Sequence, residues 1–281
     1  MPCAGLLGDT PERDYGRKLS LFNACAEPEL RRAIASLHLA PGMRVLDAGC
    51  GTGETLNLLR EAMSDEHAAQ GGAIVGFDLA AAHVRLARAR VAQSVLIAQA
   101  DALSAPLVPA SFDLVWCANT LHHLRDAVAG VERLAGLLRP GGRIALGQSA
   151  LLPEMYFAWD ARLERRVNEA VRLYYQHRYG IQERDLTAVR ALVGILRQAR
   201  LREVQTRTFM IERVSPLRSS DEAYLLEAIF RDTWGERLQP YLGAEDYQEL
   251  CRLCDPNHAG FALRRPDFHY LQSFTLVVGC V

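Results

Sequence analysis

The stretch Val45-Leu-Asp-Ala-Gly-Cys-Gly-Thr-Gly53 decides the fold of this chain. It starts as an apolar run typical of a buried strand, passes through three glycines and leads into Glu54–Arg60, where apolar residues have helical spacing. A strand, a glycine-rich turn and a helix in this order let a backbone approach a bound nucleotide, although glycines also serve other tight turns. Asp78 ends the next apolar run and favours a nucleotide-binding turn over a purely structural one, because an acid there can accept hydrogen bonds from ribose hydroxyls. Asp47 lies inside the turn and favours a cationic group over a dianionic phosphate.

Strand-like and helical patterns alternate on both sides of this stretch. Strand-like runs occupy 73–77, 94–98, 112–117 and 143–147, and helical spacing occupies 80–93 and 127–138. Helices of this length between strands predict right-handed crossovers and a mostly parallel, doubly wound sheet with helices on both faces. Two further strand-like runs, 203–214 and 270–278, come late in the chain. We therefore expect an α/β, Rossmann-like fold.

The composition indicates a large apolar core and no strong overall charge. Of the 281 residues, 49% are hydrophobic, and 32 Lys and Arg residues stand against 33 Asp and Glu residues, for a net charge of −1. A nucleic-acid partner bound through a basic surface is not expected from this balance. The sequence shows neither a membrane-spanning apolar run nor a secretory signal, and its seven scattered cysteines suit reduced thiols. We expect a cytoplasmic protein with no membrane partner.

The pattern divides the chain into four parts. We expect an N-terminal helical cap over 1–40, the nucleotide-binding core over 41–150, a helical lid insertion over 151–186, and the rest of the core over 187–281. This last part holds a second helical insertion at about 216–262. Both insertions carry aromatic and apolar residues, which predict either a closed pocket beside the sheet or a homodimer contact.

Five motifs, in order along the chain, resemble those of class I S-adenosyl-L-methionine (SAM)-dependent methyltransferases. They are Asp47–Gly53, Asp78-Leu79, Gln99–Ala102, Phe112–Val115 with Asn119–His123, and the turn Leu138–Arg143. The resemblance covers roughly 41–150. It implies a seven-stranded sheet with an antiparallel last strand, which also accounts for the two late runs. It further implies SAM as the cofactor and S-adenosyl-L-homocysteine (SAH) as its product.

The resemblance assigns roles to individual residues. It implies that Asp47 helps to hold the methionine ammonium, that Asp78 takes both ribose hydroxyls, and that Asp101 accepts the adenine amine. The other residues that it places around the cofactor are Tyr15, Gly49, Cys50, Gly51, Gly53, Leu79, Ala102 and Asn119. The alternatives are helix caps or turn formers for Asp47 and Asp101 and an Asx turn for Asn119.

Three histidines are candidates for the base that takes a proton from the methyl acceptor. His122 and His123 follow the fourth strand, and His269 enters the last one. A structural role is the alternative for each of them. The pair Cys251 and Cys254 has the spacing of half a zinc site, but no second pair follows, so we expect no metal site.

Methyl transfer to a small molecule is the function that these features predict. A secondary metabolite fits a closed aromatic pocket, and O-methylation is favoured on family frequency. A nucleic-acid or protein methyltransferase is one alternative. A SAM-binding cyclase that does not methylate is another, because a fold does not fix a function.

Overall fold

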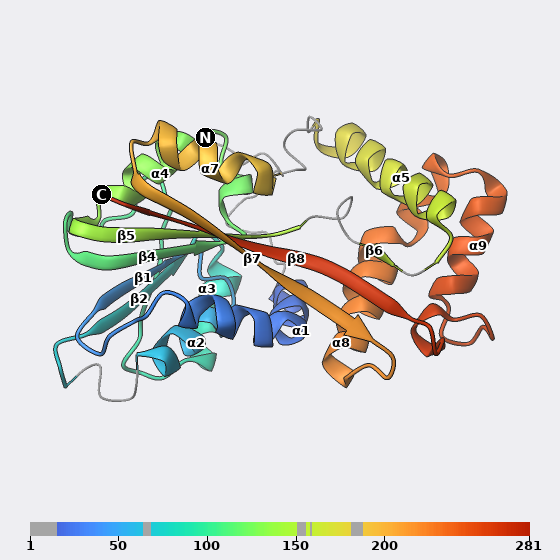
Figure 1. Ribbon diagram of the computed structural model, residues 1–281, viewed down its shortest axis with the longest axis horizontal. Helices are drawn as coiled ribbons and strands as arrows, with labels where there is room; N and C mark the ends of the chain where they lie inside the picture. The colour runs from blue at the N-terminus through green and yellow to red at the C-terminus, as the bar shows by residue number, and fades with distance from the viewer. Residues whose placement is uncertain (1–15, 64–68, 151–155, 158, 181–187) are drawn as a thin grey trace.

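A computed structural model describes residues 16–63, 69–150, 156–157, 159–180 and 188–281. One mixed sheet forms its centre (Figure 1), with strands in the order β3-β2-β1-β4-β5-β8-β6 and β7 paired to β8. The strands are β1 Arg44–Ala48, β2 Ala73–Asp78, β3 Leu96–Gln99, β4 Phe112–Ala118, β5 Leu138–Ser149, β6 Tyr156–Phe157, β7 Arg202–Val214 and β8 His269–Cys280. Strands β1 to β5 run parallel, and β8 is antiparallel to both β5 and β7. The expected Rossmann-like class is confirmed, and the two-residue strand β6 is an addition to the seven expected strands.

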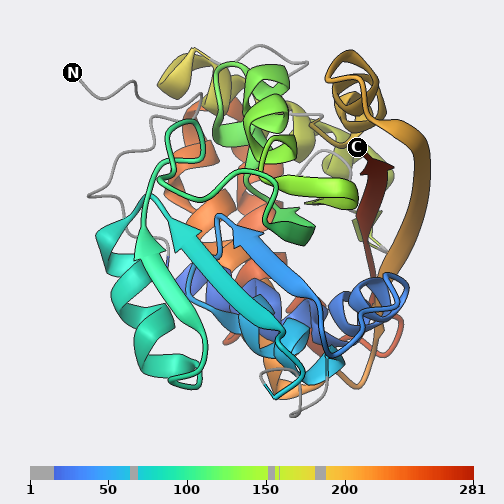
Figure 2. The same cartoon turned by 90° about the vertical axis from the view of Figure 1, so that its left-hand side faces the viewer.

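Helices cover both faces of the sheet. They are α1 Gly16–Ala35, α2 Glu54–Ala62, α3 Ala81–Arg90, α4 Ala127–Ala135, α5 Ala161–Tyr179, α7 Ala188–Gln198, α8 Ser219–Ala223 and α9 Ala244–Cys254. In Figure 1, α4 and α7 lie above the sheet and α1 and α2 lie below it. Figure 2 shows the same sheet viewed from the left-hand side of Figure 1. Strand β4 shows why both faces need cover: Leu114 and Trp116 belong to one apolar cluster, whereas Val115 and Cys117 belong to the other. An uninterrupted apolar run is typical of a strand buried on both faces.

The long strands β7 and β8 carry the inserted helices beyond the other strands. Strand β7 pairs along β8 from Cys280 to His269, but β5 pairs only with residues 274–280 of β8. Residues 269–273 of β8 therefore extend with β7 past the end of β5. The helical insertions gather around this extension, at the right of Figure 1. There a π-helix, Tyr224–Trp234, follows α8, and short 3₁₀ helices occupy Glu236–Tyr241 and Ala262–Arg264.

Two local expectations differ from the structure. The stretch Leu138–Arg143, expected as a turn, is the beginning of β5, because Leu138 pairs with Phe112 before the register shifts. Gly141 bends the strand there with a φ of +79°. The lid, expected as helical, also contributes β6, whose Phe157 pairs with Tyr270 of β8.

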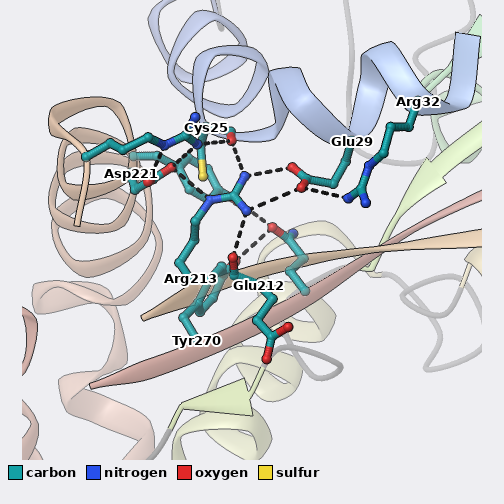
Figure 3. Close-up of polar contacts among 10 residues, drawn as sticks. Cys25, Glu29, Arg32, Glu212, Arg213, Asp221 and Tyr270 are labelled. Carbon is teal, nitrogen blue, oxygen red and sulfur yellow. Dashed lines mark hydrogen bonds and ion pairs between the residues drawn. The ribbon is translucent and has the colours of Figure 1, made fainter. Parts of the chain in front are cut away.

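A buried arginine joins three distant segments (Figure 3). Arg213 of β7 donates from Nε to Asp221 of α8 at 2.9 Å and from Nη2 to Glu29 of α1 at 2.7 Å. Its remaining N–H groups reach Glu29 again and the carbonyls of Cys25 and Glu212, so all five guanidinium donors have acceptors. The Arg213, Glu29 and Asp221 side chains are 10%, 5% and 2% exposed. This network, which we call the Arg213 cluster, fixes α1 against the C-terminal part of the chain.

Candidate cofactor and active site

The glycine turn between β1 and α2 forms the floor of the site. Gly49, Gly51 and Gly53 have φ values of +80°, +53° and +89°, a region that favours glycine. The turn is tied to the end of β2, because the N–H groups of Gly49 and Cys50 both donate to the carbonyl of Phe77. A Cβ atom at Gly49 would lie 2.3 Å from Oγ1 of Thr120, so only glycine leaves room there.

Asp78 closes the second side of the turn. Its Oδ2 accepts the N–H of Gly51 at 2.9 Å, and its Oδ1 accepts the N–H of Ala80 at 2.9 Å. Nδ1 of His83 lies 3.2 Å from the same Oδ1. The carboxylate therefore has a fixed orientation, and its side chain retains 14% exposure.

Asp47 lies under the turn in a more buried environment. Its Oδ2 accepts a hydrogen bond of 2.7 Å from Oγ1 of Thr55. Burial raises the pKa of this carboxyl to about 7; the Thr55 hydrogen bond opposes that shift, and the charge of Asp78 adds to it. A cation placed beside Asp47 would favour its charged form. Burial also raises the pKa of the nearby Cys50 thiol well above its usual value, so this thiol is protonated.

A cavity of about 310 Å³ opens above these groups. Its polar lining includes Asp47, Asp78, His83, Asp101 and Asn119. Helix α1 supplies an apolar wall through Leu19, Phe22 and Leu30, and Asn23 also lines the cavity. Glu54 at the start of α2 holds this wall against the turn, accepting a 2.6 Å hydrogen bond from each of Ser20 and Thr52.

A chain of amides and hydroxyls lies where β4 and β5 end. Oδ1 of Asn119 accepts from the N–H of Ser149 at 2.8 Å, from Oγ of Ser149 at 2.9 Å and from Nε2 of Gln148 at 3.1 Å. Oε1 of Gln148 lies 3.0 Å from Nδ1 of His122. The rings of His122 and His123 have centroids 3.9 Å apart, and His123 lines the cavity.

The structure brings most of the predicted residues together. The members of the predicted set that line the cavity are Asp47, Gly49, Cys50, Gly51, Asp78, Leu79, Asp101, Ala102, Asn119 and His123. Asp101 is exposed and forms a turn, its Oδ1 accepting the N–H of Leu103 at 2.9 Å. Gly53 lies behind the turn, where a Cβ atom would be 3.0 Å from Cα of Ala87.

The structure keeps His269 away from this group, and His122 also lies outside the cavity lining. His269 is not among the residues that line the cavity; its Nε2 lies 2.9 Å from Glu212 at the exposed end of β8. Tyr15 lies outside the residues that the structure describes. Within the described ranges, no group of three or more metal-ligating side chains forms, and no helix is long and apolar enough to span a bilayer.

Sequence reasoning missed four contributors to the site: Phe22, Thr55, His83 and Gln148. His83 follows Asp78 by five residues, within the first turn of α3, so its position carried a local signal. Thr55 is the second residue of α2 and gave a weaker signal. Phe22 and Gln148 had none, because tertiary packing alone brings them to the cavity and to Asn119.

The residues present fit a nucleoside that carries an amino-acid cation. Gly49 and Gly51 line the cavity with backbone that carries no side chain, Asp78 offers acceptors at the end of β2, and the buried Asp47 offers a charge for a cation. A pyrophosphate fits less well, because two carboxylates border the turn. The donor and acceptor set therefore agrees with SAM.

Comparisons with known proteins agree with this geometry. Residues 46–146 match the family described as "Methyltransferase domain". The chain is 38% identical over 122 residues to 27-O-demethylrifamycin SV methyltransferase of Amycolatopsis mediterranei, which covers 43% of this chain and 44% of that protein. It is 37% identical over 118 residues to ubiquinone biosynthesis O-methyltransferase of Xanthomonas campestris pv. campestris, which covers 40% of this chain and 46% of that protein. The match thus spans less than half the length of each relative.

A solved structure extends the likeness in fold beyond the matched segment. The YcgJ protein of Bacillus subtilis superposes with a TM-score of 0.54 over 90% of this chain and 98% of its own, at 16% identity. At this identity the likeness concerns the fold alone. The family match, the curated relatives and the geometry of the turn together show that this chain carries a class I SAM-dependent methyltransferase domain, whose cofactor is SAM.

Proposed function

We propose that the protein transfers a methyl group from SAM to a hydroxyl oxygen of a small molecule, with secondary metabolism as the source of the acceptor. The observation that carries the proposal is the cavity that holds Asp47, Asp78 and the glycine turn under the apolar wall of α1. Two relatives support oxygen as the acceptor atom, because their names describe a 27-O-demethylrifamycin and an O-methyltransferase of ubiquinone biosynthesis. We also retain the four-part division of the chain, with boundaries at 40, 150 and 186, as a proposal.

The residues of the chain would divide the work between binding and positioning. When bound, SAM would supply a methyl carbon on a sulfonium, which an acceptor oxygen can attack in line with the thioether of SAH as the leaving group. Asp47 would hold the ammonium end, Asp78 the ribose and Asp101 the adenine, while α1 excludes water from the cavity. The Asp78 carboxylate already accepts the N–H groups of Gly51 and Ala80 and contacts His83. The ribose hydroxyls would therefore share the two carboxylate oxygens with these groups. His123 lines the cavity and the ring of His122 packs against it, and one of these two histidines would take the acceptor proton.

Replacing Asp78 by alanine tests the binding proposal. The loss of charged hydrogen bonds is expected to weaken SAH binding by about 1.5–3 kcal/mol, which is about 10- to 150-fold in Kd. Isothermal titration calorimetry on folded protein measures this change. Asp160→Ala is the matched control, because Asp160 caps α5 through the N–H of Leu163 and does not line the cavity. Unchanged affinity in Asp78→Ala, or an equal loss in Asp160→Ala, would remove Asp78 from the site.

The raised pKa of Asp47 predicts that cofactor binding depends on pH. Ionised Asp47 attracts the SAM ammonium and protonated Asp47 does not, so affinity is expected to rise with pH through about 7. One unit below that pKa roughly a tenth of the carboxyl is ionised, so binding is expected to be about tenfold weaker near pH 6 than above pH 7. Calorimetric titrations with SAH between about pH 5.5 and 7.5 measure this slope, since an α-amino group stays mostly protonated over that range.

Two controls separate Asp47 from other titrating groups. Asp47→Asn should bind SAH with little dependence on pH, and adenosine, which lacks the amino-acid end, should bind wild-type protein with little dependence. An adenosine affinity that follows pH as steeply as that of SAH would contradict the assignment.

The raised pKa of Asp47 also affects the stability of the fold. It makes the ionised carboxyl costly in the folded state, so the contribution of Asp47 to stability falls as pH rises from about 4 to 7.

A further inference from the structure

Another cavity, of about 350 Å³, lies among the inserted helices. It opens between α5 and the end of the 3₁₀ helix Glu236–Tyr241, and α5 lies at the upper right of Figure 1. Among the described residues, none lines both this cavity and the cavity that contains Asp47 and Asp78. We call it the arginine pocket, and its lining consists of Arg162, Arg165, Arg166, Glu169, Tyr241 and Leu242.

A buried carboxylate of α9 holds two of these arginines side by side. Oδ1 of Asp246 accepts from Nη1 of Arg162 at 2.8 Å, and Oδ2 of Asp246 lies 3.3 Å from Nε of Arg166. The Asp246 side chain is 9% exposed, whereas those of Arg162 and Arg166 are 58% and 59% exposed. Asp246 therefore lies behind the two guanidinium groups and orients them, and most of their N–H donors remain for solvent or a ligand.

The one acidic residue in the lining does not neutralise these arginines. Glu169 accepts a hydrogen bond from Nε of Arg172 at 2.9 Å on Oε2, and Nη2 of Arg172 donates to Oε1. Both carboxylate oxygens of Glu169 are thus bound to an arginine that lies outside the lining. The single charge of Asp246 is left to balance Arg162 and Arg166 together.

Arg165 adds a third positive charge to the arginine pocket. Its guanidinium forms no hydrogen bond or ion pair within the part of the chain that the structure describes, although its charge acts on Asp160 at the N-cap of α5. Asp160 and Glu245 also act on Arg162, but neither lines the pocket. Three arginines face the one shared carboxylate of Asp246, which leaves two positive charges in the pocket of a chain whose net charge is −1.

A doubly charged oxyanion matches this arrangement. Guanidinium groups bind phosphate oxygens through charge-assisted hydrogen bonds, and a phosphate monoester carries about −1.5 to −2 charges at pH 7. The ring of Tyr241, packed edge-on against Tyr174 with centroids 6.3 Å apart, forms a wall for the organic part of such an ester. We propose that the arginine pocket binds the phosphate group of a phosphate monoester through Arg162, Arg165 and Arg166. This site is separate from the cofactor cavity and goes beyond the proposed function.

Titration with methyl phosphate tests the arginine pocket. At about pH 8 this ester is a dianion, and ³¹P NMR spectroscopy on the full chain measures its binding. Wild-type protein is expected to bind it saturably, with a Kd of about 1 mM or tighter. Arg165→Gln is expected to weaken binding about tenfold, because one charge-assisted hydrogen bond is lost. No saturable binding by wild-type protein overturns the proposal.

Two controls separate a built site from a general effect of charge. Arg252→Gln removes the same charge from α9, where Arg252 pairs with Glu249 at 2.6 Å and does not line the pocket, so it should bind methyl phosphate as wild-type protein does. Methyl sulfate, a monoanion of similar shape, should bind wild-type protein about tenfold more weakly than methyl phosphate. Equal losses in Arg165→Gln and Arg252→Gln, or equal affinity for the two esters, overturn the proposal.

Vesicles distinguish a soluble phosphate ester from a lipid headgroup. The full chain is sedimented with phosphatidylcholine vesicles that contain or lack phosphatidic acid, whose headgroup is a phosphate monoester. Sedimentation that requires phosphatidic acid and Arg165 assigns the pocket to a lipid, whereas methyl phosphate binding without sedimentation assigns it to a soluble ester. The affinity for SAH should be the same in Arg165→Gln as in wild-type protein, so a failure to bind SAH concerns the proposed function alone.

Discussion

Replacing Arg213 by methionine is expected to lower the free energy of unfolding by about 3–5 kcal/mol. The substitution removes the one guanidinium that Glu29 and Asp221 share and leaves both carboxylates buried, at 5% and 2% exposure. Burial alone would raise the pKa of Asp221, but hydrogen bonds from Arg218 and Arg213 outweigh it and hold that pKa below its usual value. Without Arg213, part of this compensation is lost. Chemical denaturation followed by circular dichroism measures the change.

Arg31, a surface arginine on α1, the helix that carries Glu29, provides the comparison for the Arg213 cluster. Arg31 pairs with Glu27 one turn away on α1 and with Glu61 of α2, and the three side chains are 46%, 49% and 42% exposed. Arg31→Met is expected to change stability by about 0.2–1 kcal/mol, because exposed pairs contribute little. A loss in Arg213→Met no larger than that in Arg31→Met would show that the Arg213 cluster does not stabilise the docking of α1.

Replacing Gly49 by alanine is expected to cost about 2–5 kcal/mol of stability and to abolish measurable SAH binding. The left-handed backbone at this position costs a residue with a Cβ atom about 1–2 kcal/mol. Forcing that Cβ into Thr120, whose Oγ1 would be 2.3 Å away, adds about 1–3 kcal/mol of overpacking. The turn must then move, and with it the floor of the cavity. Thermal unfolding and calorimetric titration report the two effects.

Gly71 allows the backbone and steric contributions at Gly49 to be separated. It has the same φ of +80°, but a Cβ atom there would meet nothing within 4 Å. Gly71→Ala should therefore show the backbone cost alone and should leave SAH binding unchanged. Adding Thr120→Ala to Gly49→Ala removes two of the three overlapping atoms and should recover part of the stability. Equal losses in Gly49→Ala and Gly71→Ala would mean that the contact with Thr120 is unimportant.

The sheet could be predicted because its signals are local. The apolar runs that became β1 to β4 differ from the observed strands by at most two residues at either end, since strand, turn and helix patterns lie within short windows. The Arg213 cluster could not be predicted, because Arg213 and Glu29 are 184 residues apart and neither lies in a motif. The position of α1 over the cavity depends on such contacts, so the sequence indicated a cap but not which of its residues face the ligand.

The candidate site divides in the same way. Asp47, Gly49 and Asp78 belong to one strand–turn–helix unit and the next strand, and the structure places them together as expected. His269 was suggested by its entry into the last strand, but that strand extends past β5, so its first residue lies far along the hairpin from the cavity. The sequence named Asn119 but not Gln148, because their contact joins the ends of two different strands.

The place of β8 in the sheet has a consequence for synthesis of the chain on the ribosome. Among the described residues, β7 is joined to the sheet through β8, whose 12 residues form the last strand of the fold. A nascent chain that has just exposed β7 therefore presents an unpaired edge, with Arg213 at its far end, until β8 emerges and inserts between β5 and β7. Helix α1, although made first, gains the Arg213 partner for Glu29 only after residue 213 has emerged. Closure of the wall over the cavity thus follows the emergence of β7 and β8, so binding of SAH by ribosome-bound chains of increasing length would report when β8 has inserted.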